Sequence, residues 1–77
     1  MMAQFDWVEG SSQTTVSVRH EEGHRYEFHI AGKHSRRVLG EGNIIHEDAR
    51  GKHGAGFFMQ EARAFAEREA RQRGIID

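Results

Sequence analysis

The fold is decided by Gln13-Thr14-Thr15-Val16-Ser17-Val18-Arg19-His20-Glu21-Glu22-Gly23-His24-Arg25-Tyr26-Glu27-Phe28-His29-Ile30, in which apolar and polar residues alternate on both sides of a short link. This alternation is typical of two half-buried strands. The link Glu21–Gly23 suits a three-residue hairpin loop, because the last loop residue is left-handed and glycine adopts that conformation without steric cost. Such a loop sets Val18 opposite Tyr26 and Val16 opposite Phe28, so the apolar side chains share one face. We therefore predict an antiparallel hairpin.

A third strand is expected over residues 35–42, after a short turn. In one register it places Val38 opposite Phe28 and leaves Leu39 on the outside of the sheet. The stretch Gly40–Asn43 interrupts the alternation, as a bulge does.

At Phe57 the apolar spacing changes from a period of two to that of a helix, and we predict a helix over Phe57–Arg73. Residues three or four apart form its buried stripe: Phe58, Ala62, Phe65, Ala66 and Ala70. Gly74, followed by two isoleucines, is typical of a Schellman ending.

Together these elements predict an α+β fold, a three- or four-stranded antiparallel meander packed against one C-terminal α-helix (β-β-β-α). Residues 13–77 form the single domain of this prediction. Residues 1–12 form an N-terminal segment in which Phe5 and Trp7 alternate with Asp6, so this segment is a candidate edge strand.

The composition narrows the classes of function. A chain of 77 residues with 36% hydrophobic residues allows one small domain. Because it has no cysteine, disulfides, iron–sulfur clusters and thiol nucleophiles are excluded. It has neither an apolar run long enough to cross a membrane nor a signal-peptide pattern, so we expect a cytoplasmic protein with no membrane partner. Since no nucleophile elbow, paired catalytic carboxylates or cofactor motif occurs, we expect no enzymatic activity and no cofactor.

The loop before the predicted helix is a candidate anion-binding site. No Ser, Thr, Asp or Asn stands just before the helix to cap its free N–H groups, and glycines allow a ligand to approach the backbone. The candidate anion-binding residues are Arg50, Lys52, His53, Gly54 and Gly56. The alternative is a solvated loop with a glycine cap.

A protein-binding surface is also expected. Three bulky apolar residues in succession, Phe57 to Met59, cannot all face one sheet from a helix, so one of them is lateral or exposed. Basic residues and a histidine are expected on the outer face of the sheet. The candidate protein-binding residues are Phe57, Met59, Arg19, Arg25, His29 and Arg37.

The hairpin also brings two histidines together. His20 and His24 face each other at the end of the predicted pair of strands, and a third ligand would be required for a metal site. The six histidines have no spacing typical of a metal motif, so we predict no metal and expect this pair to be partly exposed beside the turn.

From Thr14 to Gln72 the strand–strand–strand–helix order, with Gly51-Lys52 in the loop before the helix, resembles the later part of a double-stranded-RNA-binding domain. The resemblance implies contacts to RNA phosphates. The sequence departs from that family at the helix start, where Phe57-Phe58-Met59-Gln60-Glu61 replaces a run of lysines, and the family's first helix is missing. The layout is also similar to small bacterial proteins and to phage-encoded inhibitor or antitoxin domains.

We therefore expect a small non-enzymatic protein-interaction module, a regulator or inhibitor, whose partner is another protein or a second copy in a homodimer. The alternative is a nucleic-acid or phosphate-binding module. Its contacts would come from the basic loop and the start of the predicted third strand: Arg36, Arg37, Arg50, Lys52 and His53. The formal net charge of −1 provides no strong field for either partner.

Overall fold

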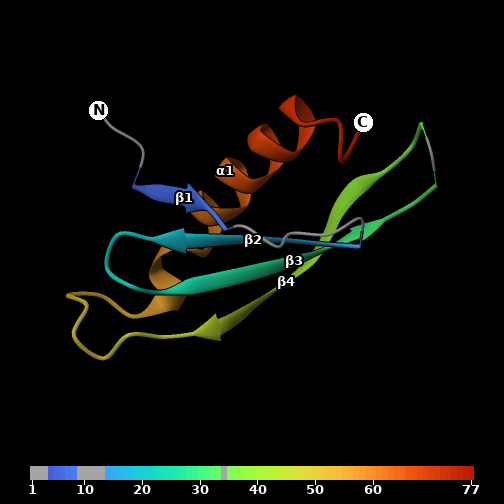
Figure 1. Ribbon diagram of the computed structural model, residues 1–77. Coiled ribbons are helices and arrows are strands. Elements are labelled where there is room, and N and C mark those ends of the chain that lie inside the picture. Colours follow the sequence, from blue (N-terminus) through green and yellow to red (C-terminus); the bar gives the residue numbers. More distant parts are fainter. Residues whose placement is uncertain (1–3, 9–13, 34) are drawn as a thin grey trace.

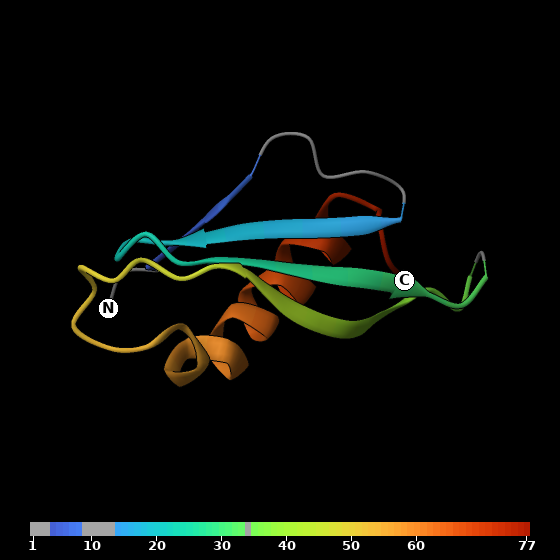
Figure 2. The same ribbon diagram turned by 90° about the horizontal axis from the view of Figure 1, so that it is seen from below.

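The computed structural model describes residues 4–8, 14–33 and 35–77. Its elements follow the chain in the order β1 (Phe5–Trp7), β2 (Thr15–His20), β3 (Arg25–Ala31), β4 (Val38–His46), the 3₁₀ helix η1 (Ala55–Phe58) and α1 (Met59–Gln72). The strands form one antiparallel sheet in the order β1-β2-β3-β4, and α1 packs across one face of it (Figure 1 and Figure 2). The predicted α+β fold is confirmed, with four strands in the sheet.

The β2–β3 hairpin has the predicted register. Its apolar pairs are Val18 with Tyr26 and Val16 with Phe28. The backbone N–H of His20 donates to the carbonyl of His24 at 2.8 Å, and Gly23 adopts a φ of 100°. The last loop position therefore requires glycine, because a side chain would be strained there.

The register considered above for the third strand does not occur, and the structure gives the one that the sequence left open. Gly42, and not Val38, lies opposite Phe28. Leu39 pairs with Ile30 and is buried, with 4% of its surface exposed. A bulge between these two pairs shifts the register by one residue. Packing explains the shift, because the bulge buries Leu39 and the Phe28 ring fills the space that a side chain at Gly42 would need.

The core lies between the sheet and α1. The sheet contributes Val16, Val18, Tyr26 and Phe28. The predicted stripe lies partly on η1, which contributes Phe58, and otherwise on α1, which contributes Ala62, Phe65, Ala66 and Ala70. The three alanines of this stripe are fully buried, so the helix backbone approaches the sheet closely. The helix therefore covers the helix-facing side of the sheet. The outer face and the sheet edges remain accessible to other molecules.

The C-terminal end of α1 forms the predicted Schellman motif. Its hydrogen bonds run from Ile75 N–H to the Ala70 carbonyl (2.8 Å) and from Gly74 N–H to the Arg71 carbonyl (3.1 Å). Gly74 has a φ of 75°, and Ile76 beyond it is 2% exposed. The motif thus turns the chain end back onto the core.

The N-terminal segment contains the expected edge strand. In β1, Phe5 pairs with His20 and Trp7 pairs with Val18. The Phe5 ring lies 5.7 Å from that of Phe65, between centroids, so β1 also contacts the helix. The rest of the predicted segment, residues 1–3 and 9–12, lies outside the described residues. In the part of the chain that the structure describes, no helix is long and apolar enough to cross a membrane.

Candidate interaction surface

The start of the helical segment carries a cap that sequence reasoning missed. The carboxylate of Glu47 accepts the backbone N–H of Ala55 at 2.6 Å through its Oε2 atom. A carboxylate at this point satisfies a free donor and complements the positive end of the helix dipole. Glu47 stands too far upstream in the sequence to fit a capping motif, and only the folded loop brings it there. The position predicted for an external anion therefore already holds one of the chain's own carboxylates.

The Arg50 side chain and the His53 backbone of this loop are also directed to internal partners. The Arg50 guanidinium donates to both carboxylate oxygens of Asp48 at 3.1 and 3.0 Å. These side-chain bonds, followed by the bond from the Arg50 backbone N–H, lower the pKa of Asp48. The backbone N–H of His53 donates to Glu22 at 3.3 Å. Because three carboxylates line or contact the loop, its surface is poorly suited to a phosphate.

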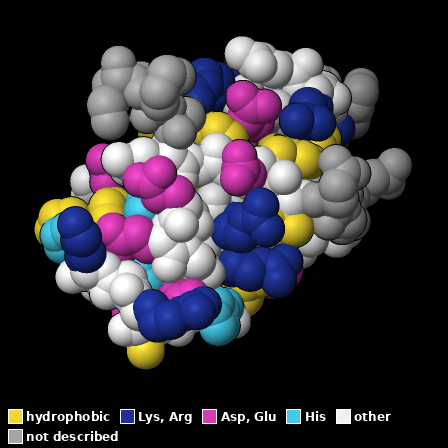
Figure 3. Space-filling model, turned by 60° about the vertical axis from the view of Figure 1, so that its left-hand side comes forward, with side chains coloured by type: hydrophobic (Ala, Val, Ile, Leu, Met, Phe, Trp, Pro, Cys, Tyr) yellow, Lys and Arg dark blue, Asp and Glu magenta, His cyan; other side chains and the backbone are white. Residues whose placement is uncertain are grey.

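The loop also forms a shallow pocket with a volume of about 260 Å³. Two of the other residues predicted for the anion site, Lys52 and Gly54, line this pocket. Gly56 lies in the first turn of η1 with open space where a Cβ would stand. The structure thus brings Lys52, His53 and Gly54 together around this pocket and sets Glu47 and Asp48 among them, whereas Arg50 does not line it. Figure 3 shows the same mixture, with Lys and Arg side chains interspersed among Asp and Glu side chains over this end of the molecule.

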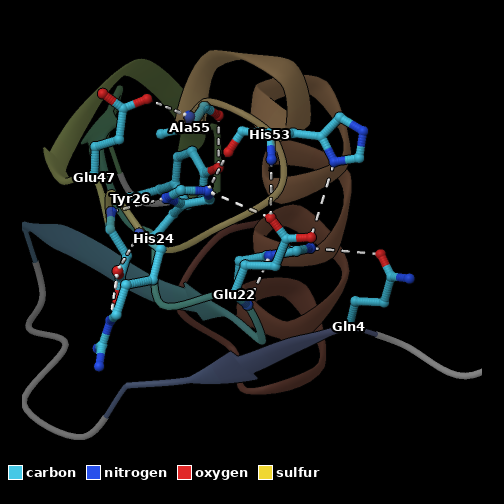
Figure 4. A network of polar contacts seen from close by, with 10 residues as sticks. Gln4, Glu22, His24, Tyr26, Glu47, His53 and Ala55 are labelled. Carbon is cyan, nitrogen blue, oxygen red and sulfur yellow. Dashed lines mark hydrogen bonds and ion pairs between the residues drawn. The ribbon is translucent and has the colours of Figure 1, made fainter.

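The two turn-flanking histidines are buried, not partly exposed as the sequence suggested. His20 is 1% exposed and His24 is 0% exposed. The Nδ1 atom of His24 accepts the backbone N–H of Asp48 at 3.0 Å, and its Nε2 atom donates to the His53 carbonyl at 2.8 Å. Figure 4 shows this ring between the hairpin and the loop, beside Glu22. His24 therefore fastens the loop to the sheet.

His20 has a matching role inside the hairpin. Its Nδ1 atom accepts the backbone N–H of Glu22 at 3.1 Å, and its ring stacks on Phe58 with centroids 4.0 Å apart. Burial lowers the pKa of His20, and the nearby carboxylate of Glu22 opposes this change. Among the described residues, no group of three or more His, Asp or Glu side chains has the geometry of a metal site.

A buried tyrosine completes the contact between sheet and helix start. The Tyr26 hydroxyl donates to the Ala55 carbonyl at 2.6 Å. Burial, helped by the Glu47 carboxylate, raises the pKa of Tyr26 to about 12. The phenol is therefore held neutral as a structural donor.

The predicted surface on the outer face of the sheet is only partly assembled. Arg19 and Arg25 lie opposite each other on this face, and His29 lies opposite Thr15. The placement of Arg37 with them is wrong. Its side chain turns to the C-terminal end of the chain and donates to the Asp77 carboxylate at 3.1 Å, because that carboxylate neutralises it there.

The two apolar candidates on the helical segment differ in exposure. Phe57 is 66% exposed, whereas Met59 is partly buried against the core. The Phe57 ring stacks on the His53 ring with centroids 4.4 Å apart. The expectation that one residue of this triplet is exposed is confirmed, and that residue is Phe57.

Three of the four exposed large hydrophobic residues among the described residues lie on the edge strand β4, which sequence reasoning did not select. Val38 is 53% exposed, Ile44 is 43% exposed and Ile45 is 47% exposed. The strand lies at the end of the sheet order, with only β3 beside it (Figure 1). The signal in the sequence was the pair Ile44-Ile45, which follows the glycine-rich interruption and has no apolar partner in the predicted hairpin.

The two halves of β4 have different surroundings. At the bulge, the Arg63 guanidinium donates to the Leu39 carbonyl at 2.7 Å and to the Gly40 carbonyl at 2.8 Å. From Glu41 to His46, no hydrogen bond from the described residues reaches the strand apart from its pairing with β3. This second half contains both exposed isoleucines.

No protein-family model matches the chain, and no curated protein or solved structure matches it. Function is therefore argued from the geometry and chemistry of these residues.

Proposed function

We propose that this chain is a non-enzymatic protein-interaction module that accepts an extended segment of a partner along β4. One observation carries the proposal. Among the described residues, three of the four large hydrophobic side chains that are clearly exposed, Val38, Ile44 and Ile45, belong to this single edge strand. Apolar residues gathered on an edge, beside free backbone groups, favour pairing with another strand.

The backbone of β4 supplies the physical basis for binding. An edge strand presents a row of N–H and C=O groups, and an added strand pairs with them through main-chain hydrogen bonds. Arg63 already bonds to two carbonyls in the first half of the strand. Residues 41–46 remain, and at the usual rise of a strand they offer an edge of about 20 Å.

The side chains along this edge define the chemistry of the partner. Ile44 pairs with Tyr26 and so lies on the helix-facing side, whereas Asn43 pairs with Glu27 on the outer side. Ile45 is the extra residue of a bulge between the Tyr26–Ile44 and Arg25–His46 pairs. An extended segment with apolar residues at alternate positions would cover Ile44 on the helix-facing side of the sheet and pass beside this bulge. Because each isoleucine is already more than half buried, covering the rest contributes roughly half of the 1.5–3 kcal/mol that a fully exposed side chain would give, before the costs of association.

The test compares two exposed apolar positions. Ile45→Lys places a charge on the β4 edge, and Phe57→Lys places the same charge on the other apolar candidate surface. Both side chains are substantially exposed, at 47% and 66%, so both variants should retain the melting temperature of the original chain. Affinity capture from cells, followed by hydrogen exchange with each captured protein, should show loss of binding in Ile45→Lys alone and protection of amides 41–46.

Other outcomes separate the alternatives. Loss of binding in Phe57→Lys alone would contradict the proposal and favour the helical surface. Capture that disappears after nuclease treatment and weakens steeply with salt would favour the nucleic-acid alternative, because counterion release governs such binding. If sedimentation shows a dimer that Ile45→Lys dissociates, the partner strand is a second copy of β4, paired antiparallel about a two-fold axis.

A further inference from the structure

The buried imidazoles of His20 and His24 each accept a backbone hydrogen bond at the Nδ1 atom. The Nδ1 atom of His20 accepts the backbone N–H of Glu22, and the Nδ1 atom of His24 accepts the backbone N–H of Asp48. An Nδ1 atom that accepts must be unprotonated, so the ring proton of each histidine lies on Nε2. The folded arrangement therefore requires both histidines to be neutral.

His24 holds the loop at two separate points. Its Nδ1 atom takes the Asp48 N–H at 3.0 Å, and its Nε2–H group donates to the His53 carbonyl at 2.8 Å. A proton added at Nδ1 would set two donors face to face across the first of these contacts, which turns an attraction into a repulsion. Loss of the Asp48 contact would free the segment that directly follows β4.

The charges around this pair come from every element packed against it. On the hairpin, Glu22 lies 3.8 Å from the Nε2 atom of His24 and 3.8 Å from the Nδ1 atom of His53. For His20, burial is the largest effect and lowers the pKa, and the adjacent His24 lowers it further. The opposing carboxylates belong to the hairpin turn and the helix: Glu22, Glu21 and Glu61.

The loop and the N-terminal segment complete this environment. The Asp48 carboxylate is neutralised by Arg50, and the Glu47 carboxylate is engaged by the Ala55 N–H. Before β1, the neutral side chain of Gln4 lies 3.4 Å from the Nε2 atom of His20. Two opposing effects therefore act on these histidines. Nearby carboxylates favour protonation of the rings, whereas the hydrogen bonds accepted by the Nδ1 atoms are lost when a proton binds.

We propose that His24 forms a proton-sensitive latch, which holds the loop 47–54 against the β2–β3 hairpin while its ring is neutral and releases the loop when its Nδ1 atom is protonated, and that His20 holds the hairpin turn beside it in the same way. The loop suits this role, because its glycines gain much conformational freedom once the contacts to His24 are lost. Release would uncover the buried ring of His24 and loosen the chain just beyond the end of β4. The device is independent of which partner β4 binds.

The direction of the pH effect follows from His20. Because the folded state lowers its pKa below the ordinary 6.5, the folded state disfavours the proton. This contribution to stability is complete above about pH 6.5 and is lost as the pH falls through the lower value of the folded state. For the latch itself the direction follows from geometry, because a proton on the His24 Nδ1 atom removes the acceptor of the Asp48 N–H. Acidification therefore opens the latch and alkalinisation does not.

The experiment follows the latch in the intact chain. Nitrogen-15 NMR of the imidazoles reports the tautomer and charge of each histidine from about pH 7.5 to about pH 5. Hydrogen exchange in the same range reports the opening of the loop. We expect Nε2–H tautomers at the upper pH, and a fall of about tenfold or more in the protection factor of the Asp48 amide as the rings become charged.

His24→Asn provides the matched variant, because the asparagine carbonyl can still accept the Asp48 N–H but does not titrate. Its loop protection should change by less than about twofold over the range, whereas the control His29→Asn, altered on the outer face, should behave like the original chain. If His24→Asn does not fold, the NMR result decides alone. Protonated rings with an unchanged loop, or neutral rings with an opened loop, would overturn the proposal.

Discussion

Replacement of Gly42 by alanine tests the register of β4, on which the whole edge depends. A Cβ atom at this position would lie 2.5 Å from both Cδ1 and Cε1 of Phe28. Carbon atoms in contact normally stand about 3.5–4 Å apart, so the added methyl group needs about 1 Å that the structure does not have. The Phe28 ring is fully buried and cannot swing into solvent. Either the ring or the strand must therefore move.

The cost of that movement can be estimated. Overpacking of a closed core costs about 1–3 kcal/mol. A domain of this size has a free energy of unfolding of about 4–12 kcal/mol in total, so the loss is a large fraction of it. Since each 1 kcal/mol moves the melting temperature of a small domain by about 4–8 °C, Gly42→Ala should melt several degrees lower.

Urea unfolding of Gly42→Ala beside Gly56→Ala measures this effect directly. A Cβ at Gly56 meets nothing within 4 Å, so this control adds the same methyl group in open space. The control should lie within about 1 kcal/mol of the original chain, or be slightly more stable because its unfolded state has less freedom. Equal stability of the two variants would refute the pairing of Gly42 with Phe28, and with it the assignment of faces along β4.

Further predictions concern the helix end and the buried tyrosine. Gly74→Ala should lower the free energy of unfolding in urea by about 1 kcal/mol, because Gly74 has a φ of 75° and its absent Cβ has nothing within 4 Å, so only backbone strain contributes. Tyr26 is the single tyrosine, and its ultraviolet absorbance should titrate at about pH 12 in the folded chain, not near 10. Because folding raises this pKa, the associated stability is complete below about pH 10 and is lost as the pH rises through about 12. Tyr26→Phe should cost about 1–2 kcal/mol in the same urea assay, since the Ala55 carbonyl loses its donor; a cost near zero would show that this hydrogen bond adds nothing.

The hairpin could be predicted because its determinants are local. The alternation of residues 14–30 and the position of Gly23 fix loop length, register and faces together, and all three agree with the structure. The helix stripe and the Schellman end are local in the same sense. Each depends on residues within one or two turns of each other.

The parts that sequence reasoning missed depend on contacts between distant segments. The position of β4 is fixed by how Gly42 meets the Phe28 ring, and the helix start is capped by Glu47 through a loop whose path no periodicity specifies. The histidines are different, because a signal was present. His20 and His24 share the parity of Val16 and Tyr26, which places them on the buried face. Their polarity suggested exposure, whereas hydrogen bonds at both ring nitrogens allow the burial.

The unequal halves of β4 are the strongest physical argument for a partner. Natural sheets blunt their edges with charged side chains, bulges or covering elements, because an open apolar edge promotes aggregation. Here the first half has both a bulge and the Arg63 guanidinium on its carbonyls. The second half also contains a bulge, at Ile45 between the Tyr26–Ile44 and Arg25–His46 pairs, but among the described residues no guanidinium covers its carbonyls. It carries Ile44 and Ile45 at 43% and 47% exposure in a chain with few large apolar residues for its own core. A sequence that covers the carbonyls of one half of an edge with an arginine and places exposed isoleucines on the other half is best explained if another strand covers that second half.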